Sequence, residues 1–180
     1  MLNIENSILI IIDIQEKLVK AAKEGEICAK NSAKLLKAAN ILNIPTIITE
    51  QYPKGLGKTV TEISQEMTTG TTVIEKSSFS AMLEPEFNKH TIQTDRKQVI
   101  LCGIETHICV LQTAQDLIKS GFEVYIVRDG VSSRSTDERD IGLELAKQYG
   151  AKITGTEIVL FELLKTSKHP NFKEIQALIK

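Results

Sequence analysis

Six short runs of apolar, mostly β-branched residues are spaced along the chain, and polar positions rarely alternate within them. The runs cover residues 7–12, 46–49, 72–74, 98–102, 123–127 and 151–154. Continuous apolar runs of this length are typical of strands that are buried on both faces, as in parallel sheets. The pattern therefore predicts six buried parallel strands.

Between these runs lie segments in which apolar residues recur every three or four positions, which is typical of helices. They cover residues 30–42, 108–119, 135–149, 157–165 and 171–179. Ser135 with Glu138 matches a capping box, and Gly121 and Gly150 stand where a helix would end. The alternation of strands and helices predicts an α/β, three-layer fold with a six-stranded parallel sheet and helices on both faces. We expect one domain over residues 1–180.

Composition narrows the class of protein. With 42% hydrophobic and 25% charged residues and a net charge of -1, the chain resembles an ordinary globular protein. No basic stripe suggests a nucleic-acid partner, so we expect none. No apolar stretch approaches the roughly 18 residues that cross a bilayer, and the start of the chain has no basic leader. We expect no membrane partner and a cytoplasmic location.

The three cysteines, Cys28, Cys102 and Cys109, are an odd number without the spacing of a metal site, so a disulfide framework is not expected. Cys109 follows the predicted strand 98–102 closely and falls within the first turns of a predicted helix. The positive end of a helix dipole favours the thiolate. Cys109 is therefore the candidate nucleophile, and we interpret Cys28 and Cys102 as structural.

Two charged residues stand at the ends of predicted strands. Asp13 follows the run 7–12, and Lys76 follows the run 72–74. Taken alone, Asp13 is equally well explained as a helix N-cap, and Lys76 as a surface lysine. Ligands of open α/β sheets bind beyond the carboxyl ends of the strands. If the three strands are neighbours, Asp13 could accept the thiol proton of Cys109 while the Lys76 ammonium stabilises the thiolate.

Four segments then form a known pattern. They are Ile10 to Gln15, Thr49 to Gly57, Glu75 to Ser80, and Gly103 to Val110. On these residues the sequence resembles the isochorismatase-like cysteine hydrolase superfamily, and the segment from Thr49 is similar to its isochorismatase domain-containing branch. The resemblance spans nearly the whole chain.

The resemblance implies a sheet of Rossmann-like strand order and a catalytic triad of Asp13, Lys76 and Cys109. It also implies a cis peptide bond between Ile104 and Glu105. In this family that bond turns a backbone N–H toward the site, so the N–H groups of Glu105 and Cys109 are expected to form an oxyanion hole.

On this basis we expect a hydrolase that cleaves an amide-type C–N bond of a small molecule through a thioester intermediate. Two alternatives remain: an isochorismatase-type vinyl ether hydrolase, and a catalytically silent scaffold of the same fold. A phosphate-binding loop ending at Gly57 is disfavoured, because its first glycine would have to stand at Tyr52.

Other expectations concern the surroundings of the triad. Nicotinamidases of the superfamily bind a metal through an aspartate and histidines after the second strand, whereas residues 50–67 contain no histidine, so we expect no metal and no cofactor. His107 is interpreted as a packing residue that could instead contact substrate. A homo-oligomer is expected, as in other family members. Four further candidates border the motifs and could line a substrate pocket: Gln15, Gln51, Tyr52 and Phe79.

Overall fold

All six predicted strands pair into one sheet in the computed structural model, which describes residues 1–180. The strands are β1 (Ser7–Ile12), β2 (Thr46–Gln51), β3 (Thr71–Lys76), β4 (Gln98–Ile104), β5 (Glu123–Ser132) and β6 (Lys152–Thr154). They lie in the order β3-β2-β1-β4-β5-β6, and every neighbouring pair is parallel. This confirms the six-stranded parallel sheet and the Rossmann-like strand order.

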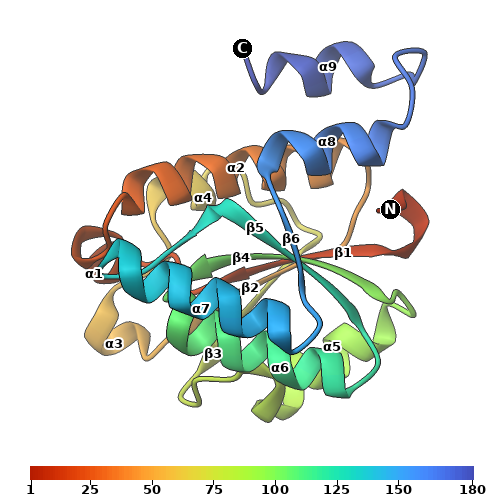
Figure 1. Ribbon diagram of the computed structural model, residues 1–180. Helices are drawn as coiled ribbons and strands as arrows, with labels where there is room; N and C mark the ends of the chain where they lie inside the picture. The colour runs from red at the N-terminus through yellow and green to blue at the C-terminus, as the bar shows by residue number, and fades with distance from the viewer.

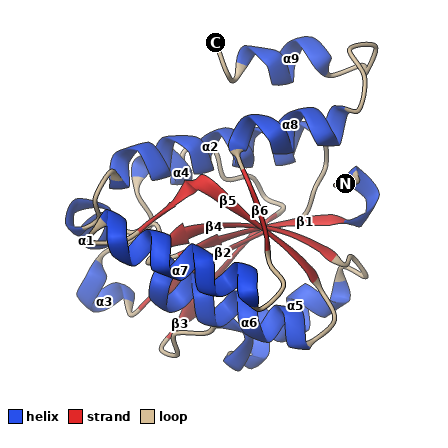
Figure 2. Cartoon of the chain, in the orientation of Figure 1, coloured by secondary structure: helices blue, strands red, loops and turns tan.

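Helices cover both faces of the sheet, which confirms the three-layer α/β fold. Figure 1 shows α2 and α8 on one side of the strands and α5, α6 and α7 on the other, and Figure 2 shows the strands between these two layers. The helices are α1 (Glu16–Ala21), α2 (Gly25–Ile41), α3 (Pro53–Leu56), α4 (Thr61–Ser64), α5 (Pro85–Gln93), α6 (Leu111–Lys119), α7 (Thr136–Gln148), α8 (Thr156–Leu164) and α9 (Phe172–Ala177). No helix combines the length and the apolar character that crossing a bilayer requires.

The side chains of β1 show why its apolar run is continuous. Leu9 and Ile11 belong to one hydrophobic cluster, together with residues of α2 and α8. Ile8, Ile10 and Ile12 belong to a second cluster, together with residues of α6 and α7. Because successive side chains of a strand point to opposite faces, a strand with helices on both sides needs apolar residues at every position.

The predicted helix ends of α6 and α7 are also confirmed. Ser135 is the N-cap of α7, and its hydroxyl accepts a hydrogen bond of 3.2 Å from the backbone N–H of Glu138. Gly121 follows α6 with φ 84, and Gly150 follows α7 with φ 105. Glycine is favoured there because a Cβ disfavours positive φ.

Several elements differ from the prediction: α1 and α4 were not predicted, and β5 extends to Ser132. Helix α5 was not predicted, because its only fully buried side chains are Phe87 and Thr91, which is too few for a clear helical repeat. β2 extends two residues beyond the predicted strand 46–49, to Gln51, and residues 53–56 form the single turn α3. Of these elements, α3 follows the carboxyl end of β2 and lies beside α1 in Figure 1, whereas α5 lies apart from them on the side of the sheet that α6 covers.

Candidate active site

Asp13 and Lys76 form a buried ion pair. Lys76 Nζ lies 2.7 Å from Asp13 Oδ2, and both side chains are 0% exposed. Asp13 directly follows β1, and Lys76 is the last residue of β3. Their strands are not neighbours, contrary to the condition set out from the sequence, because β2 lies between them. At about 4.8 Å per strand the gap is roughly 10 Å, and the long lysine side chain spans part of it.

The intervening strand β2 supplies a partner to each charged group. The Thr49 hydroxyl donates a hydrogen bond of 2.7 Å to Asp13 Oδ1. Lys76 Nζ donates a hydrogen bond of 2.6 Å to Gln51 Oε1. It also donates to the backbone carbonyls of Ser78 and Phe79, at 3.1 Å and 3.3 Å. The ammonium is therefore surrounded by oxygen acceptors.

Thr49 was missed as a site residue. Its position carried a signal, because it ends the second apolar run and pairs with Ile12, the residue before Asp13. Nothing else separates it from the other threonines of the strands.

Cys109 lies in η3 (Thr106–Val110), a single π-helical turn between β4 and α6. Cys109 is buried, with 7% of its surface exposed. Burial is the largest cause that raises the pKa of the Cys109 thiol, to about 12, and the Asp13 charge raises it further while the Lys76 charge lowers it. Contrary to the expected thiolate, the pKa is raised, because burial disfavours the charged form of the thiol.

The Asp13 carboxylate faces both the ammonium and the thiol. Oδ2 lies 2.7 Å from Lys76 Nζ, and the Cys109 thiol lies within hydrogen-bonding reach of the Asp13 and Lys76 side chains. The carboxylate is therefore placed to accept the thiol proton. A protonated thiol becomes a strong nucleophile only after a neighbouring base accepts its proton. A fixed positive charge beside it then stabilises the thiolate.

The peptide bond between Ile104 and Glu105 is cis, as the resemblance implies. The backbone N–H of Glu105 has no hydrogen-bond acceptor within the chain. The Glu105 carboxylate forms an ion pair with Arg134, whose Nε and Nη2 donate hydrogen bonds of 3.0 Å and 3.3 Å to its two oxygens. The next residue, Thr106, is anchored to the end of β5 by a hydrogen bond of 3.1 Å from its N–H to Ser133 Oγ.

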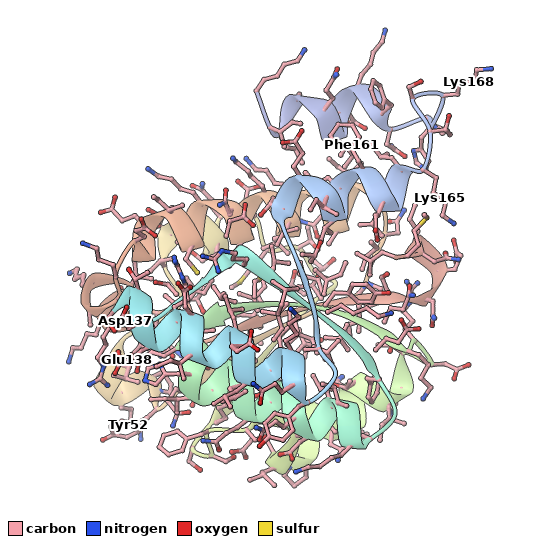
Figure 3. The ribbon with its side chains drawn as sticks, viewed as in Figure 1. Tyr52, Asp137, Glu138, Phe161, Lys165 and Lys168 are labelled. Atoms are coloured by element: carbon pink, nitrogen blue, oxygen red, sulfur yellow. The ribbon has the colours of Figure 1, made fainter.

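The remaining sequence candidates lie at different distances from the pair. Gln15 is fully buried, and its amide is hydrogen-bonded to backbone groups. Gln51 contacts Lys76. Tyr52 and Phe79 are 61% and 55% exposed. Tyr52 lies at the periphery of the molecule next to α3 (Figure 3).

His107 contacts a serine just after β5 and the start of α7, and its role stays a prediction. Its Nδ1 lies 3.0 Å from Ser133 Oγ, and its Nε2 lies 3.7 Å from Oε1 of Glu138 at the start of α7 (Figure 3). The contacts of the other two cysteines agree with a structural interpretation. Burial raises the pKa of both Cys28 and Cys102, and Cys28 Sγ donates to the Gly130 carbonyl at 3.1 Å.

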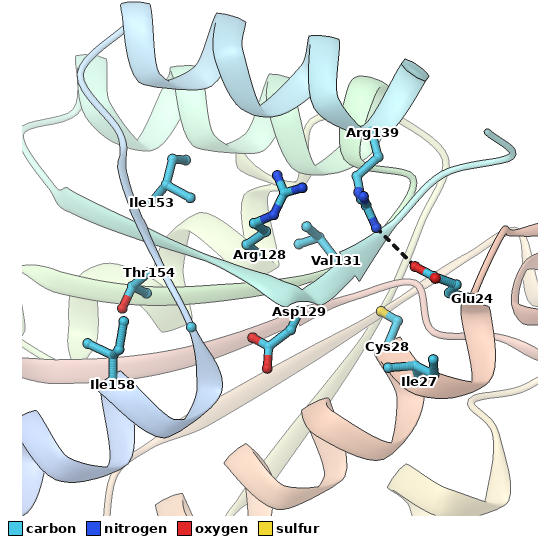
Figure 4. Close-up of a pocket in the computed structure, with 11 residues that line it drawn as sticks. Glu24, Ile27, Cys28, Arg128, Asp129, Val131, Arg139, Ile153, Thr154 and Ile158 are labelled. Atoms are coloured by element: carbon cyan, nitrogen blue, oxygen red, sulfur yellow. Dashed lines mark hydrogen bonds and ion pairs between the residues drawn. The ribbon is translucent and has the colours of Figure 1, made fainter. Parts of the chain in front are cut away.

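A separate cavity of about 470 Å³ opens beside β5 and β6, and its lining includes neither Asp13 nor Lys76 (Figure 4). Its charged groups already have partners. Arg139 Nη1 lies 3.1 Å from Glu24 Oε2, and Asp129 Oδ1 accepts a hydrogen bond of 2.8 Å from the N–H of Thr156. No group of three or more His, Cys, Asp or Glu residues is placed to hold a metal ion. Asp13, Lys76 and Cys109 remain the candidate site residues.

Known proteins resemble this chain over nearly its whole length. The family model described as Isochorismatase domain matches residues 7–158. Isochorismatase domain-containing protein 2 of Danio rerio is 46% identical over 178 residues, which cover 99% of this chain and 89% of the relative. Secreted isochorismatase effector Isc1 of Phytophthora sojae is 40% identical, over 97% of this chain and 85% of the relative. The solved structure of MAR1 ribonuclease from Caenorhabditis elegans has a TM-score of 0.94 and 43% identity, covering 99% of this chain and 91% of that one.

Proposed function

This chain belongs to the isochorismatase family, and we propose that it is a cysteine-dependent hydrolase that cleaves an amide-type C–N bond of a small molecule. The observation that carries the proposal is the buried carboxylate of Asp13, which is paired with Lys76 at 2.7 Å and lies within hydrogen-bonding reach of the Cys109 thiol. Beside it is a thiol whose pKa is raised to about 12. Such a thiol is protonated at neutral pH and needs a base before it can attack.

In the first step, Asp13 takes the proton of Cys109 Sγ, and the thiolate attacks the carbonyl carbon of the substrate. A bond forms between sulfur and carbon, and the carbonyl oxygen becomes an oxyanion. The backbone N–H groups of Glu105 and Cys109 bind that oxyanion, and the Glu105 N–H has no competing acceptor within the chain. The Lys76 ammonium balances the negative charge as the proton leaves the sulfur.

In the second step, the tetrahedral intermediate collapses and the C–N bond breaks. Asp13 gives its proton to the leaving amine, and Cys109 remains as a thioester. Asp13 then takes a proton from a water molecule, whose oxygen attacks the thioester. The acid leaves, the proton returns to Cys109, and Lys76 stays positively charged throughout. The hydrogen bond from Thr49 to Oδ1 leaves Oδ2 as the proton carrier.

The wider assignment follows from the same proposal. Residues 1–180 form one hydrolase domain that acts in the cytoplasm as a homo-oligomer on a small-molecule substrate. Gln51, Tyr52 and Phe79 border the Lys76 end of the site and are the candidates for its pocket. Apart from the substrate and one water molecule, the proposed route uses only groups of the chain itself.

The test compares the wild-type protein with Cys109→Ala on small amides, ureido compounds and isochorismate. Ammonia, protein-bound thioester and pyruvate are followed. Cys102→Ala is the matched control, because it removes a buried thiol outside the site. Ammonia release and an acyl adduct that are lost only in Cys109→Ala support the amidase.

Other outcomes of this experiment would favour a different function. Pyruvate formation that survives the Cys109→Ala change indicates an isochorismatase-type vinyl ether hydrolase. Absence of turnover and of adduct with every compound indicates a catalytically silent scaffold.

A second candidate is RNA cleavage, because the structural relative from Caenorhabditis elegans at 43% identity is described as a ribonuclease. The net charge of -1 argues against it, since binding of nucleic acid depends on basic surfaces. Incubation with labelled single-stranded RNA decides between them. Cleavage lost in Asp13→Asn, with no turnover of any amide, would favour the ribonuclease.

A further inference from the structure

The amide of Gln15 clamps the backbone of Gln51. Its Nε2 donates to the Gln51 carbonyl at 3.0 Å and to the Gly57 carbonyl at 2.7 Å, and its Oε1 accepts from the Gln51 N–H at 2.7 Å. The Gln15 residue is 0% exposed. Both main-chain groups of Gln51 are therefore fixed by one side chain, as they would be by a neighbouring strand.

The side chain of Gln51 continues this chain of contacts to Lys76. Its Oε1 accepts the hydrogen bond of 2.6 Å from Lys76 Nζ, and its Nε2 donates to the Ser77 carbonyl at 2.9 Å. The second bond sets which end of the amide faces the ammonium. Gln15 also stands two residues after Asp13, and its own N–H donates to the Asp13 carbonyl at 2.8 Å. Gln15 thus ties the strand end of Asp13 to the residue that holds Lys76.

We propose that Gln15 is a positioning residue, which acts through Gln51 to hold the Lys76 ammonium against Asp13 and Cys109. The inference rests on the proposed function of these three residues. A lysine side chain is flexible and can rotate its donors toward any acceptor, so the direction of its charge has to be set by fixed partners. A fixed ammonium beside the sulfur favours the thiolate form of Cys109.

The loop after Gln51 does not depend on Gln15 alone. Glu50 Oε1 accepts hydrogen bonds of 2.8 Å from both the N–H and the hydroxyl of Thr59. Lys58 Nζ lies 2.9 Å from Glu50 Oε2. This second anchor keeps the loop attached when the Gln15 amide is removed, so the change acts mainly on Gln51.

Gln98 offers a matched control. It is also buried, and its amide likewise clamps backbone, with Nε2 donating to the Met1 carbonyl at 3.1 Å and Oε1 accepting from the Asn3 N–H at 2.9 Å. It is the first residue of β4, at the opposite end of the sheet from the site. Gln98→Met therefore removes the same kind of contacts without touching Lys76.

The experiment measures alkylation of Cys109 by iodoacetamide as a function of pH, in Gln15→Met, Gln51→Met, the double variant and Gln98→Met. The thiolate displaces iodide, an S–C bond forms, and peptide mass spectrometry separates Cys109 from Cys28 and Cys102. Thermal unfolding of each variant is recorded in parallel. Gln15→Met and Gln51→Met are expected to slow alkylation at a fixed pH by roughly 3- to 10-fold, because less thiolate forms.

The double variant is expected to be no slower than Gln15→Met, since both changes act on one path. Gln98→Met is expected to lose thermal stability and keep the wild-type pH profile. A wild-type profile in Gln15→Met overturns the proposal, and so does a wild-type profile in Gln51→Met beside a shifted one in Gln15→Met. If Gln15→Met does not fold, an unchanged Gln51→Met overturns it as well.

Alkylation needs no substrate, so the two proposals fail separately. A normal profile in these variants, together with turnover that depends on Cys109, removes only the role of Gln15. Turnover that persists in Cys109→Ala removes the proposed function, whatever the alkylation shows.

Discussion

The hydroxyl of Thr49 donates a 2.7 Å hydrogen bond to Oδ1 of Asp13, and both residues are 0% exposed. A valine at this position has a similar shape and cannot donate. We predict that Thr49→Val lowers kcat about 10-fold, because the carboxylate loses the donor that fixes its orientation, and lowers the free energy of unfolding by about 1 to 3 kcal/mol. Steady-state kinetics and urea unfolding measure the two effects.

Thr46→Val is the control for this prediction. Thr46 begins the same strand, is buried, and makes only a long contact of 3.4 Å with the Ile44 carbonyl. A kcat that falls equally in both variants would show that Thr49 acts through packing.

Breaking the buried ion pair from one side is expected to be costly. Lys76→Met leaves the Asp13 carboxylate buried without its counter-charge, and we predict a loss of about 3 to 5 kcal/mol in the free energy of unfolding. Asp13→Asn combined with Lys76→Met leaves no unpaired charge, so the double variant is expected to be more stable than Lys76→Met alone. Urea unfolding of the three proteins tests this. A double variant less stable than Lys76→Met contradicts it.

Reactivity of Cys109 and turnover should respond in opposite directions to one substitution. The Asp13 charge is among the causes that raise the Cys109 pKa to about 12. Asp13→Asn removes that charge, so the pKa falls and more thiolate exists at any given pH below it. We predict faster alkylation by iodoacetamide at pH 8 to 9, together with loss of turnover because the base is gone. Slower alkylation in Asp13→Asn would mean that Asp13 does not act on the thiol electrostatically.

Alkaline pH should destabilise the fold through its buried thiols. Burial raises the pKa of Cys102 from 9.0 to about 12, whereas in the unfolded chain the thiol keeps its ordinary value. The folded state therefore holds its proton after the unfolded state has lost it. Stability is full below pH 9 and falls as the pH rises from about 9 toward 12, by at most about 1.4 kcal/mol per pH unit for each such thiol.

The measurement is urea unfolding at pH 8, 9 and 10, with Cys102→Ala beside the wild type. The variant is less stable at pH 8 because it leaves a cavity, but its stability should fall less steeply with pH. Equal slopes in the two proteins would exclude Cys102 as a source of the effect.

The sheet could be predicted from the sequence because strands that are buried on both faces have continuous runs of apolar residues. β1 has an apolar side chain at each position from Ile8 to Ile12, since both faces pack against helices. Asp13, Lys76 and Cys109, the proposed triad, could each be placed at a strand or helix end for the same reason. Their meeting in one site depended on the strand order, which only the resemblance supplied.

Other parts of the site cannot be recognised from a single sequence. Thr49 is a β-branched residue in a strand, where threonine is common whatever its hydroxyl contacts. The clamp formed by Gln15 depends on where the loop after β2 returns, which no periodicity records. The raised pKa of Cys109 arises from burial by distant segments, whereas the sequence revealed only its place at a helix start.

β3 stands at the edge of the sheet, and its last residue delivers the ammonium across β2 to Asp13. Edge strands separate from a sheet more readily than central ones, because only one side is held by a ladder of hydrogen bonds. Each transient separation of β3 from β2 would move the Lys76 ammonium away from the Asp13 carboxylate. Hydrogen exchange at the β3 amides should therefore measure how often β3 separates from β2. The fraction of molecules able to catalyse the reaction should depend on the same equilibrium.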